Sequence, residues 1–599
     1  MNRNTVLAIV LATIVIIAGT FIQATFFSSP VENTVTETAA EQPVVADVPS
    51  GYGVDFTAYG NDPANSTFDI ENDVMKITFD TKGATVSSVI LKEHKLNGEP
   101  SQFIYKEEGD VNPYMLYSAD DKSSAIDSEF NYTISESASS EITQIKFYRD
   151  FITADGKEFT IEKIFAVPAN DEYMIQMVVN VKTADGSSIP LSENGSMYSI
   201  YFGPQIGPEF EEINTSYGDY RRVNILRADK GGVSNVKYSD NVYVYDNLEE
   251  EDEYLDWIDL TGKYFTLIAI PENKQSIKEY TTTVESKEEG IIQKNDIYIT
   301  RSSSSSSSVT DVYSFYMGPQ DAGELSRYDS EDENVFGLTD HRLKESMSSS
   351  WLSWLEKILG FCLSVIYKVI PNYGIAIIVM TIVIKLLIHP LTKRSQDSTA
   401  RMSALAPKIN EIKERYPDDP QAQNTAMAKL YKEENIKPMS SCWPMLIQFP
   451  ILIAFYGLLS KNIELRGAMF IPGWITDLSA PETIFTLPFR IPLLGNEIHL
   501  LPIVYTVSMI FSMKLSQSAT SGVGQSSGML NFMTYGMPII FFFILYNAPS
   551  GLLVYWTVMN IITMGTQLYV NKKKGTKYKE EFQKQQEEKR LARKKRNRR

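Results

Sequence analysis

Six apolar segments limit what this chain of 599 residues can fold into. A helix of about 20 apolar residues crosses a bilayer, and the sequence has several segments near that length. They cover residues 5–27, 373–391, 443–460, 499–515, 531–546 and 551–570. The first is longer than the apolar part of a cleaved signal peptide and lacks a clear cleavage site. We therefore expect an α-helical polytopic membrane protein with six transmembrane helices, the first an uncleaved anchor over residues 1–27.

Charge is divided unevenly along the chain, whose net charge is −18. Residues 28–345 carry 25 Lys and Arg against 58 Asp and Glu, a net charge of −33; the rest carries 31 basic and 16 acidic residues, a net charge of +15. Membrane proteins retain Lys and Arg in their cytoplasmic loops, so the acidic region is expected outside the cytoplasm. The basic tail over 571–599 places both termini in the cytoplasm. The 392–441 loop is then cytoplasmic and the 461–498 loop periplasmic.

The acidic region divides into a linker and a strand-rich domain. Residues 28–53 are rich in Ser, Thr, Glu, Pro and Ala, which is typical of a flexible linker. Residues 54–340 contain many short segments of alternating polarity, such as "MKITFD". This frequency of short strands predicts a large periplasmic β-sandwich domain.

The sequence gives no support for metal or disulfide chemistry. The two cysteines, Cys362 and Cys442, flank apolar segments, and the four histidines are scattered without ligand spacing. We expect no metal site, no cofactor and no disulfide scaffold.

An amphipathic helix is predicted over residues 347–370, directly before the second apolar segment. The apolar face consists of Trp351, Trp354, Leu355, Ile358, Leu359 and Cys362, and the polar stripe of Ser353, Glu356, Lys357, Gly360, Ser364 and Lys368. Such a helix either lies in the interface at the outer surface of the bilayer or packs on a soluble core. The span that follows at once favours the interface.

The 392–441 loop has the spacing of a helical hairpin. One row of apolar residues is Met402, Leu405, Ile409, Ile412 and Tyr416, and a second is Met427, Leu430 and Tyr431. The sequence "PDDPQ" separates the rows, which predicts two antiparallel helices with a coiled-coil seam. The alternative is a solvated loop with some helix.

Lys385 is a cation inside the second apolar segment. Its Cα is expected roughly 9 Å inside the cytoplasmic boundary of this span, at 1.5 Å per residue. A lysine at this depth either extends its ammonium to the interface, pairs with an acid, or faces a water-filled cavity. The other predicted spans have no interior Asp or Glu, so the ion pair is the weakest of the three.

Several motifs resemble the YidC/Oxa/Alb family of membrane protein insertases, in its Gram-negative type with a large periplasmic domain. The most specific are "TIVIKLLIHPLTK" (381–393), "MSALAPKINEIKERYPDD" (402–419), "SSCWPMLIQFPILIAFYGLL" (440–459), "IELRGAMFIPGWITDLSAP" (463–481) and "APSGLLVYWTVMNIIT" (548–563). The resemblance covers nearly the whole chain.

The resemblance implies a five-helix insertase core around a hydrophilic groove, open to the cytoplasm and to lipid and closed to the outside. It implies groove residues at Lys385, Thr381, Trp556, Gln448 and Asn560. It implies an apolar slide for the substrate at Phe449, Phe455, Met537 and Phe541. The hairpin would receive the substrate through Met402, Leu405, Ile409, Ile412, Met427 and Leu430. Many members have arginine at the position of Lys385, and lysine keeps the charge but loses the planar fork of donors.

The function implied is insertion of nascent membrane proteins into the bacterial inner membrane, alone or with the Sec translocon. This mechanism is physical and needs no catalytic residue. Besides nascent chains, the implied partners are the Sec translocon, the ribosome through the basic tail, and anionic lipids. DNA is not among them.

Two other functions fit parts of the sequence. A secondary transporter or channel would also have a wet intramembrane cavity, but we find no inverted repeat. The family's periplasmic domain resembles sugar-mutarotase sandwiches, so a carbohydrate-active domain on a membrane anchor is the other alternative. Residues 54–340 show no acid/base constellation, and a shared fold does not transfer function.

Overall fold

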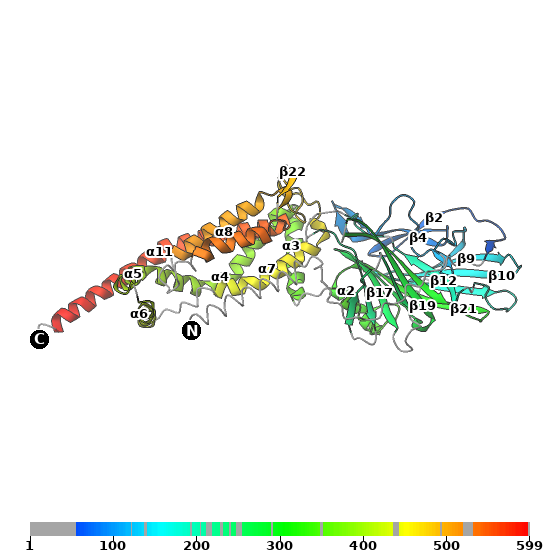
Figure 1. Cartoon of the computed structure of the whole chain (residues 1–599), viewed down its shortest axis with the longest axis horizontal. Coiled ribbons are helices and arrows are strands. Elements are labelled where there is room, and N and C mark those ends of the chain that lie inside the picture. The colour runs from blue at the N-terminus through cyan, green and yellow to red at the C-terminus, as the bar shows by residue number, and fades with distance from the viewer. Residues whose placement is uncertain are drawn as a thin grey trace. The chain divides into compact units, whose positions relative to one another are not determined.

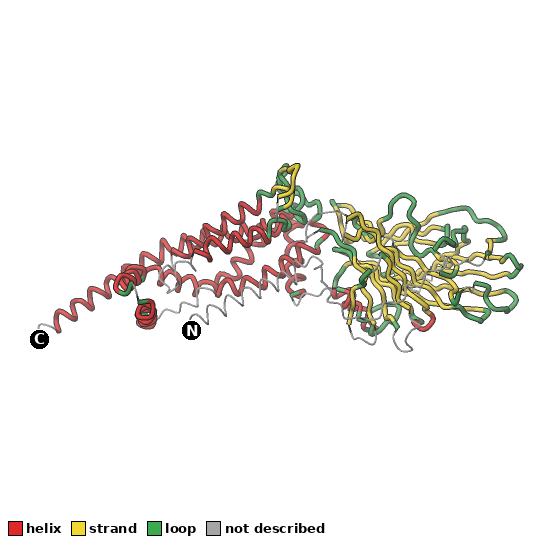
Figure 2. Tube along the Cα trace, in the orientation of Figure 1, coloured by secondary structure: helices red, strands yellow, loops and turns green. Residues whose placement is uncertain are grey.

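The computed structural model describes residues 55–596, with gaps in its description. The gaps are residues 121, 137–140, 192–193, 204, 211–217, 228–231, 239–240, 247–253, 289–290, 348–351, 418, 435–442, 492–493 and 519–530. The predicted anchor and linker, residues 1–53, lie outside the described residues. The chain divides into two compact units, Met1–Ser349 and Ser350–Arg599. Strands make up most of the first and helices most of the second (Figures 1 and 2).

The first unit is built from antiparallel sheets. A ten-stranded sheet contains, in spatial order, β1 (Phe56–Ala58), β9 (Ile142–Thr153), β10 (Glu158–Pro168), β11 (Met174–Thr183), β21 (Ser308–Pro319), β18 (Phe265–Pro271), β17 (Leu255–Thr261), β14 (Arg222–Arg227) and β15 (Gly232–Asn235), with β8 (Asn131–Glu136) paired to β9. A five-stranded sheet contains β16 (Val242–Asp246), β19 (Ile277–Glu288), β20 (Ile291–Ser302), β12 (Ser196–Phe202) and β7 (Leu116–Ser118). A four-stranded sheet contains β2 (Thr67–Glu71), β3 (Met75–Asp80), β4 (Thr85–Leu96) and β5 (Glu99–Gln102), and β6 (Ile104–Tyr105) pairs with β13 (Gln205–Ile206).

Alternation along these strands forms the core between the sheets. In β3 the residues Met75, Ile77 and Phe79 are buried, and the residues between them are not. Phe79 lies 5.1 Å from Phe165 of the ten-stranded sheet, measured between ring centroids. Similar contacts join the five-stranded sheet to the ten-stranded one, so both smaller sheets cover the large one. The β-rich domain that the alternating pattern predicts is therefore confirmed.

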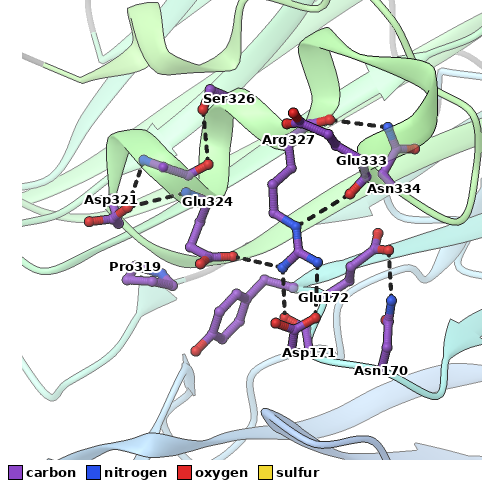
Figure 3. Close-up of polar contacts among 12 residues, drawn as sticks. Asn170, Asp171, Glu172, Pro319, Asp321, Glu324, Ser326, Arg327, Glu333 and Asn334 are labelled. Carbon is purple, nitrogen blue, oxygen red and sulfur yellow. Dashed lines mark hydrogen bonds and ion pairs between the residues drawn. The ribbon is translucent and has the colours of Figure 1, made fainter.

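A short helical segment follows β21 and is fixed to the turn between β10 and β11 (Figure 3). Helix α2 (Ala322–Ser326) is capped by Asp321, whose carboxylate accepts hydrogen bonds from two backbone amides of the first turn. The guanidinium of Arg327 donates to the carboxylates of Asp171, at 2.9 Å, and Glu324, at 3.2 Å. These bonds attach the end of the β-rich unit to its own sheet.

The second unit consists mainly of helices. They are α3 (Ser353–Val369), α4 (Tyr373–Ala404), α5 (Ala406–Arg415), α6 (Pro420–Glu433), α7 (Trp443–Lys461), α8 (Leu501–Ser518), a π-helical turn (Phe532–Gly536), α10 (Met537–Ile544) and α11 (Ser550–Arg596). Strands β22 (Phe485–Ile491) and β23 (Gly495–Ile498) form a hairpin between α7 and α8. Helix α11 continues past the predicted end of the last span into the basic tail.

One helix of the described residues is long and apolar enough to cross a membrane, over Tyr373–Pro390. The apolar helices Leu501–Leu515 and Thr534–Ile544 are shorter. By length and composition the structure thus identifies one of the six predicted spans.

Helix α3 lies within the range of the predicted amphipathic helix and packs against α7. The expected polar stripe faces α7, because Glu356 lies against Gly457 and Gly360 lies against Leu458. Glycine has no side chain at these two points, so the helices approach closely. An exposed apolar stripe remains on the other side, made of Trp354, Ile358, Phe361, Val365 and Val369. Glu356 and Gly360 of the polar stripe therefore contact α7, while Lys357 and Lys368 are exposed. The position of this helix in the bilayer interface stays a prediction.

Candidate functional site

Lys385 lies on α4 with its side chain partly buried between helices. Its Nζ donates a hydrogen bond of 2.8 Å to Oγ1 of Thr563 on α11. The same hydroxyl donates to the carbonyl oxygen of Met559 one turn earlier, at 2.7 Å. Among the residues that the structure describes, no acidic side chain pairs with Lys385. The ammonium is thus directed toward α11 and has a neutral partner.

The contact with Lys385 belongs to a stripe of polar and aromatic residues along α11. Trp556, Asn560 and Thr563 follow one another at intervals of four and three residues, which places them on one face of the helix. The amide nitrogen of Asn560 donates to the hydroxyl of Ser508 on α8, at 3.1 Å. The stripe therefore contacts α4 near Lys385 and α8 through Ser508.

Aromatic rings adjoin the polar stripe. Trp556 stacks on Tyr505 of α8 with centroids 5.3 Å apart, and Phe541 of α10 meets Trp556 edge-on at 6.1 Å. Two of the predicted site residues, Trp556 and Phe541, are thus in contact. They form an apolar surface next to the hydrogen-bonded groups.

Two predicted site residues occupy buried positions instead of an open surface. Thr381 is fully buried, and its hydroxyl donates to the carbonyl of Ile377 in its own helix at 2.6 Å. Phe455 is also fully buried and stacks on Tyr555 with centroids 4.2 Å apart. Both side chains pack between helices in this structure, and their roles in the groove and the slide stay predictions.

The other predicted residues are more open. Phe449 is exposed, and Gln448, Met537, Phe541, Trp556 and Asn560 are partly buried. They come from three helices, α7, α10 and α11. The structure brings Trp556, Asn560 and Phe541 together and places the first two on the same face as the partner of Lys385.

The predicted substrate-receiving residues of the hairpin form a closed cluster. Leu405, Ile409, Met427, Leu430 and Tyr431 are buried against one another, and Ile412 packs on them. Burial raises the pKa of Tyr431 to about 12. The side chain of Met402 lies outside the described residues. Since the cluster holds the two helices together, a substrate would have to bind to other faces of the hairpin.

The segment between α7 and α8 closes one end of the helical unit. The hydroxyl of Tyr546 donates to the carbonyl of Glu497 at 3.0 Å, and the backbone amide of Ser550 donates to the carbonyl of Ala480 at 2.8 Å. The buried carboxylate of Glu482 accepts from the indole of Trp474 at 3.2 Å and from the backbone amide of Leu501. Burial raises the pKa of Glu482. These bonds fix the segment to α8, α11 and the end of α10.

Sequence reasoning missed two residues of the site. Thr563 belongs to the polar row of the last apolar segment, and its heptad relation to Trp556 could have identified it. Ser508 is one of several hydroxyl-bearing residues in α8, and no pattern distinguishes it from the others. Its part in the site depends on contact with Asn560, which the sequence does not encode locally.

The features of the helical unit indicate the class of protein to which the chain belongs. A cation and hydrogen-bonding side chains lie between apolar helices, and the same chain contains a separate β-rich domain. In the part of the chain that the structure describes, no group of His, Cys, Asp and Glu could hold a metal ion. The chain is thus a helical membrane protein with a polar site among its apolar helices.

Comparisons with known proteins identify the family. The family described as 60Kd inner membrane protein matches residues 365–588, and the YidC periplasmic domain matches residues 67–361. Membrane protein insertase YidC of Treponema denticola is 34% identical over 593 residues, covering 96% of this chain and 99% of that protein. The Treponema pallidum protein of the same name is 31% identical with the same coverage.

A solved structure also matches, an active YidC insertase with its first transmembrane domain resolved. It is 16% identical, covers 87% of this chain and 95% of the other, and has a TM-score of 0.34. From the sequence relatives, the chain belongs to the YidC family of membrane protein insertases, which are inner membrane proteins.

Proposed function

We propose that this insertase receives nascent membrane proteins at the polar site around Lys385 and releases their transmembrane segments into lipid. The observation that carries the proposal is the hydrogen bond of Lys385 to Thr563, a neutral partner on another helix. An ammonium without an acid among apolar helices is costly, and such groups mark functional sites in membrane proteins. Its field attracts an acidic group on the incoming chain.

The mechanism uses the polar and the apolar surfaces in turn. The short acidic tail of a substrate enters a hydrophilic groove, where Lys385 and Asn560 lower the cost of desolvation. The apolar segment then moves along Phe449, Met537 and Phe541 into the bilayer, driven by burial of its apolar area. The membrane potential contributes about 2.3 kcal/mol per charge for every 100 mV. No covalent step is involved, so we do not assign an enzymatic activity.

The proposed arrangement has six spans, with both termini in the cytoplasm and the β-rich domain in the periplasm. Two features of the sequence support this arrangement. They are the net charge of −33 over residues 28–345 and the 14 Lys and Arg of residues 571–599. The basic end of α11 would bind the ribosome or anionic lipid. The Sec translocon is proposed as a partner for substrates with long external domains.

Photocrosslinking tests the site. A crosslinking residue is placed at position 385 and, in a matched variant, at Leu387, an exposed position of the same helix. Ribosomes stalled on a short single-span membrane protein are then added. We expect adducts to the nascent chain at 385 and adducts to lipid at 387. Lipid adducts alone at 385 would contradict the proposal and favour a transporter.

A further inference from the structure

The hairpin β22–β23 is a two-stranded sheet without a third strand among the described residues. Its register pairs Phe485 with Ile498 and Ile491 with Gly495. The register is irregular between Thr486 and Ile491, so the regular alternation of faces holds for the paired residues Phe485 and Thr486. The strand presents four apolar residues, Phe485, Leu487, Phe489 and Ile491.

Large apolar side chains of this hairpin are exposed. Phe489 is 61% exposed and Phe485 54% exposed, and Ile484 next to the strand is 48% exposed. A two-stranded hairpin is only marginally stable in water, and exposed aromatic side chains add a further cost. Among the residues that the structure describes, no segment of the helical unit covers these side chains.

The position of the hairpin indicates what covers it. Strand β23 is separated from α8 by only two residues, and the bond from Tyr546 to Glu497 attaches it to the end of α10. An exposed apolar stripe continues directly from β23 along α8, at Leu500, Ile503, Val507 and Phe511. In an inner membrane protein, an exposed stripe on an apolar helix faces lipid. The exposed apolar side chains of the hairpin are continuous in the chain with that stripe.

We propose that the hairpin inserts Phe485 and Phe489 into the lipid interface at the end of α8. Phe side chains are favoured at the boundary between headgroups and acyl chains, and the guanidinium of the adjacent Arg490 can extend to lipid phosphate. This anchoring holds the segment between α7 and α8 against the helix ends that it closes. The proposal rests on the membrane arrangement described under the proposed function.

Fluorescence quenching in vesicles tests the proposal. The full-length chain, with Cys362→Ser and Cys442→Ser, carries one cysteine labelled with an environment-sensitive fluorophore. Phe489→Cys probes the most exposed aromatic position of β22, Thr486→Cys is the matched control at an exposed polar position of the same strand, and Leu387→Cys on α4 reports insertion into the bilayer. Vesicles of phosphatidylcholine and phosphatidylglycerol contain doxyl-labelled lipid, and iodide serves as the aqueous quencher.

We expect doxyl lipid to quench the probe at 489 several-fold more strongly than the probe at 486, and iodide to show the reverse order. Equal access of iodide to both probes, with the probe at 387 quenched by doxyl lipid, would overturn the proposal and leave the insertase arrangement intact. Shielding of 489 from iodide without doxyl quenching would assign the surface around Phe489 to a second copy of the chain, which also overturns it. A probe at 387 that iodide alone quenches would refute the membrane arrangement itself.

Discussion

Two buried lysines show how differently the two units hold a positive charge. Lys163 lies in the β-rich unit, fully buried on the inner face of β10. Its ammonium donates to the carbonyl oxygens of Gly83, at 3.0 Å, and Tyr114, at 2.5 Å. Lys385 in the helical unit is partly exposed and donates to one hydroxyl. Neither has an acidic partner among the described residues.

In our proposal, this difference separates a structural lysine from a functional one. Lys163 donates to two fixed backbone carbonyls, and these hydrogen bonds join β10 to two other segments. Burial lowers the pKa of Lys163 well below the ordinary value of lysine. Lys385 keeps unused donors and some exposure, so it can attract a group from outside the molecule. The same side chain thus stabilises one unit and, in our proposal, binds the substrate in the other.

The largest effect is expected from Lys385→Gln. Removing the charge should lower insertion of a short single-span membrane protein by about tenfold or more, because the attraction for its acidic tail is lost. Lys385→Arg should retain most activity, since the charge is kept. Protease protection of the substrate in proteoliposomes measures insertion.

Lys514→Gln is the matched control for this experiment. Lys514 is exposed near the end of α8, and its replacement should leave insertion close to wild type. Equal loss in both variants would mean that net charge matters and the position of Lys385 does not.

Lys163→Met should lower stability without changing insertion. The carbonyls of Gly83 and Tyr114 lose their buried donor, which costs about 1 to 3 kcal/mol. Hydrogen exchange of β10 in the full chain measures this loss as reduced protection. Lys157→Met, at an exposed lysine of the same unit, is the control. Unchanged protection in Lys163→Met would show that the buried ammonium contributes nothing to the β-rich unit.

A smaller, pH-dependent effect is expected at Asp259. This buried carboxyl on β17 accepts hydrogen bonds from the backbone and side-chain nitrogens of Asn224, both at 2.9 Å, and burial raises its pKa to about 8. Because the pKa is higher in the folded than in the unfolded chain, the stabilising contribution is complete below pH 3.8 and is lost as the pH rises toward 8.

Urea unfolding of wild type and Asp259→Asn at about pH 5 and about pH 8 checks this sign. The wild type should lose stability relative to the variant at the higher pH. A constant difference between the two proteins would mean that Asp259 is ionised at both pH values.

Local periodicity predicted most of the elements but not their partners. The alternation of Met75, Ile77 and Phe79 predicts a strand with one buried face, and β3 has that face in the core. The polar stripe of α3 shows the limit of this reasoning, because Glu356 and Gly360 contact α7 and their spacing does not reveal that partner. Phe455 is buried by Tyr555, a residue far away in the sequence. Spacing shows which residues share a face, while long-range contacts determine what covers it.

Thr381→Val is expected to have the smallest effect and tests the distinction between groove and packing residues. The hydroxyl of Thr381 is buried and bonded within its own helix, and valine has nearly the same shape, so insertion should stay within about twofold of wild type. Thr563→Val is the matched variant, and it should reduce insertion more because Lys385 loses its partner. Equal loss in both variants would mean that Thr381 also faces the substrate. In that case the polar site would extend along α4 to Thr381. The number of hydrogen-bond acceptors around a side chain, which differs between Lys163 and Lys385, would then not distinguish a structural residue from one that binds the substrate.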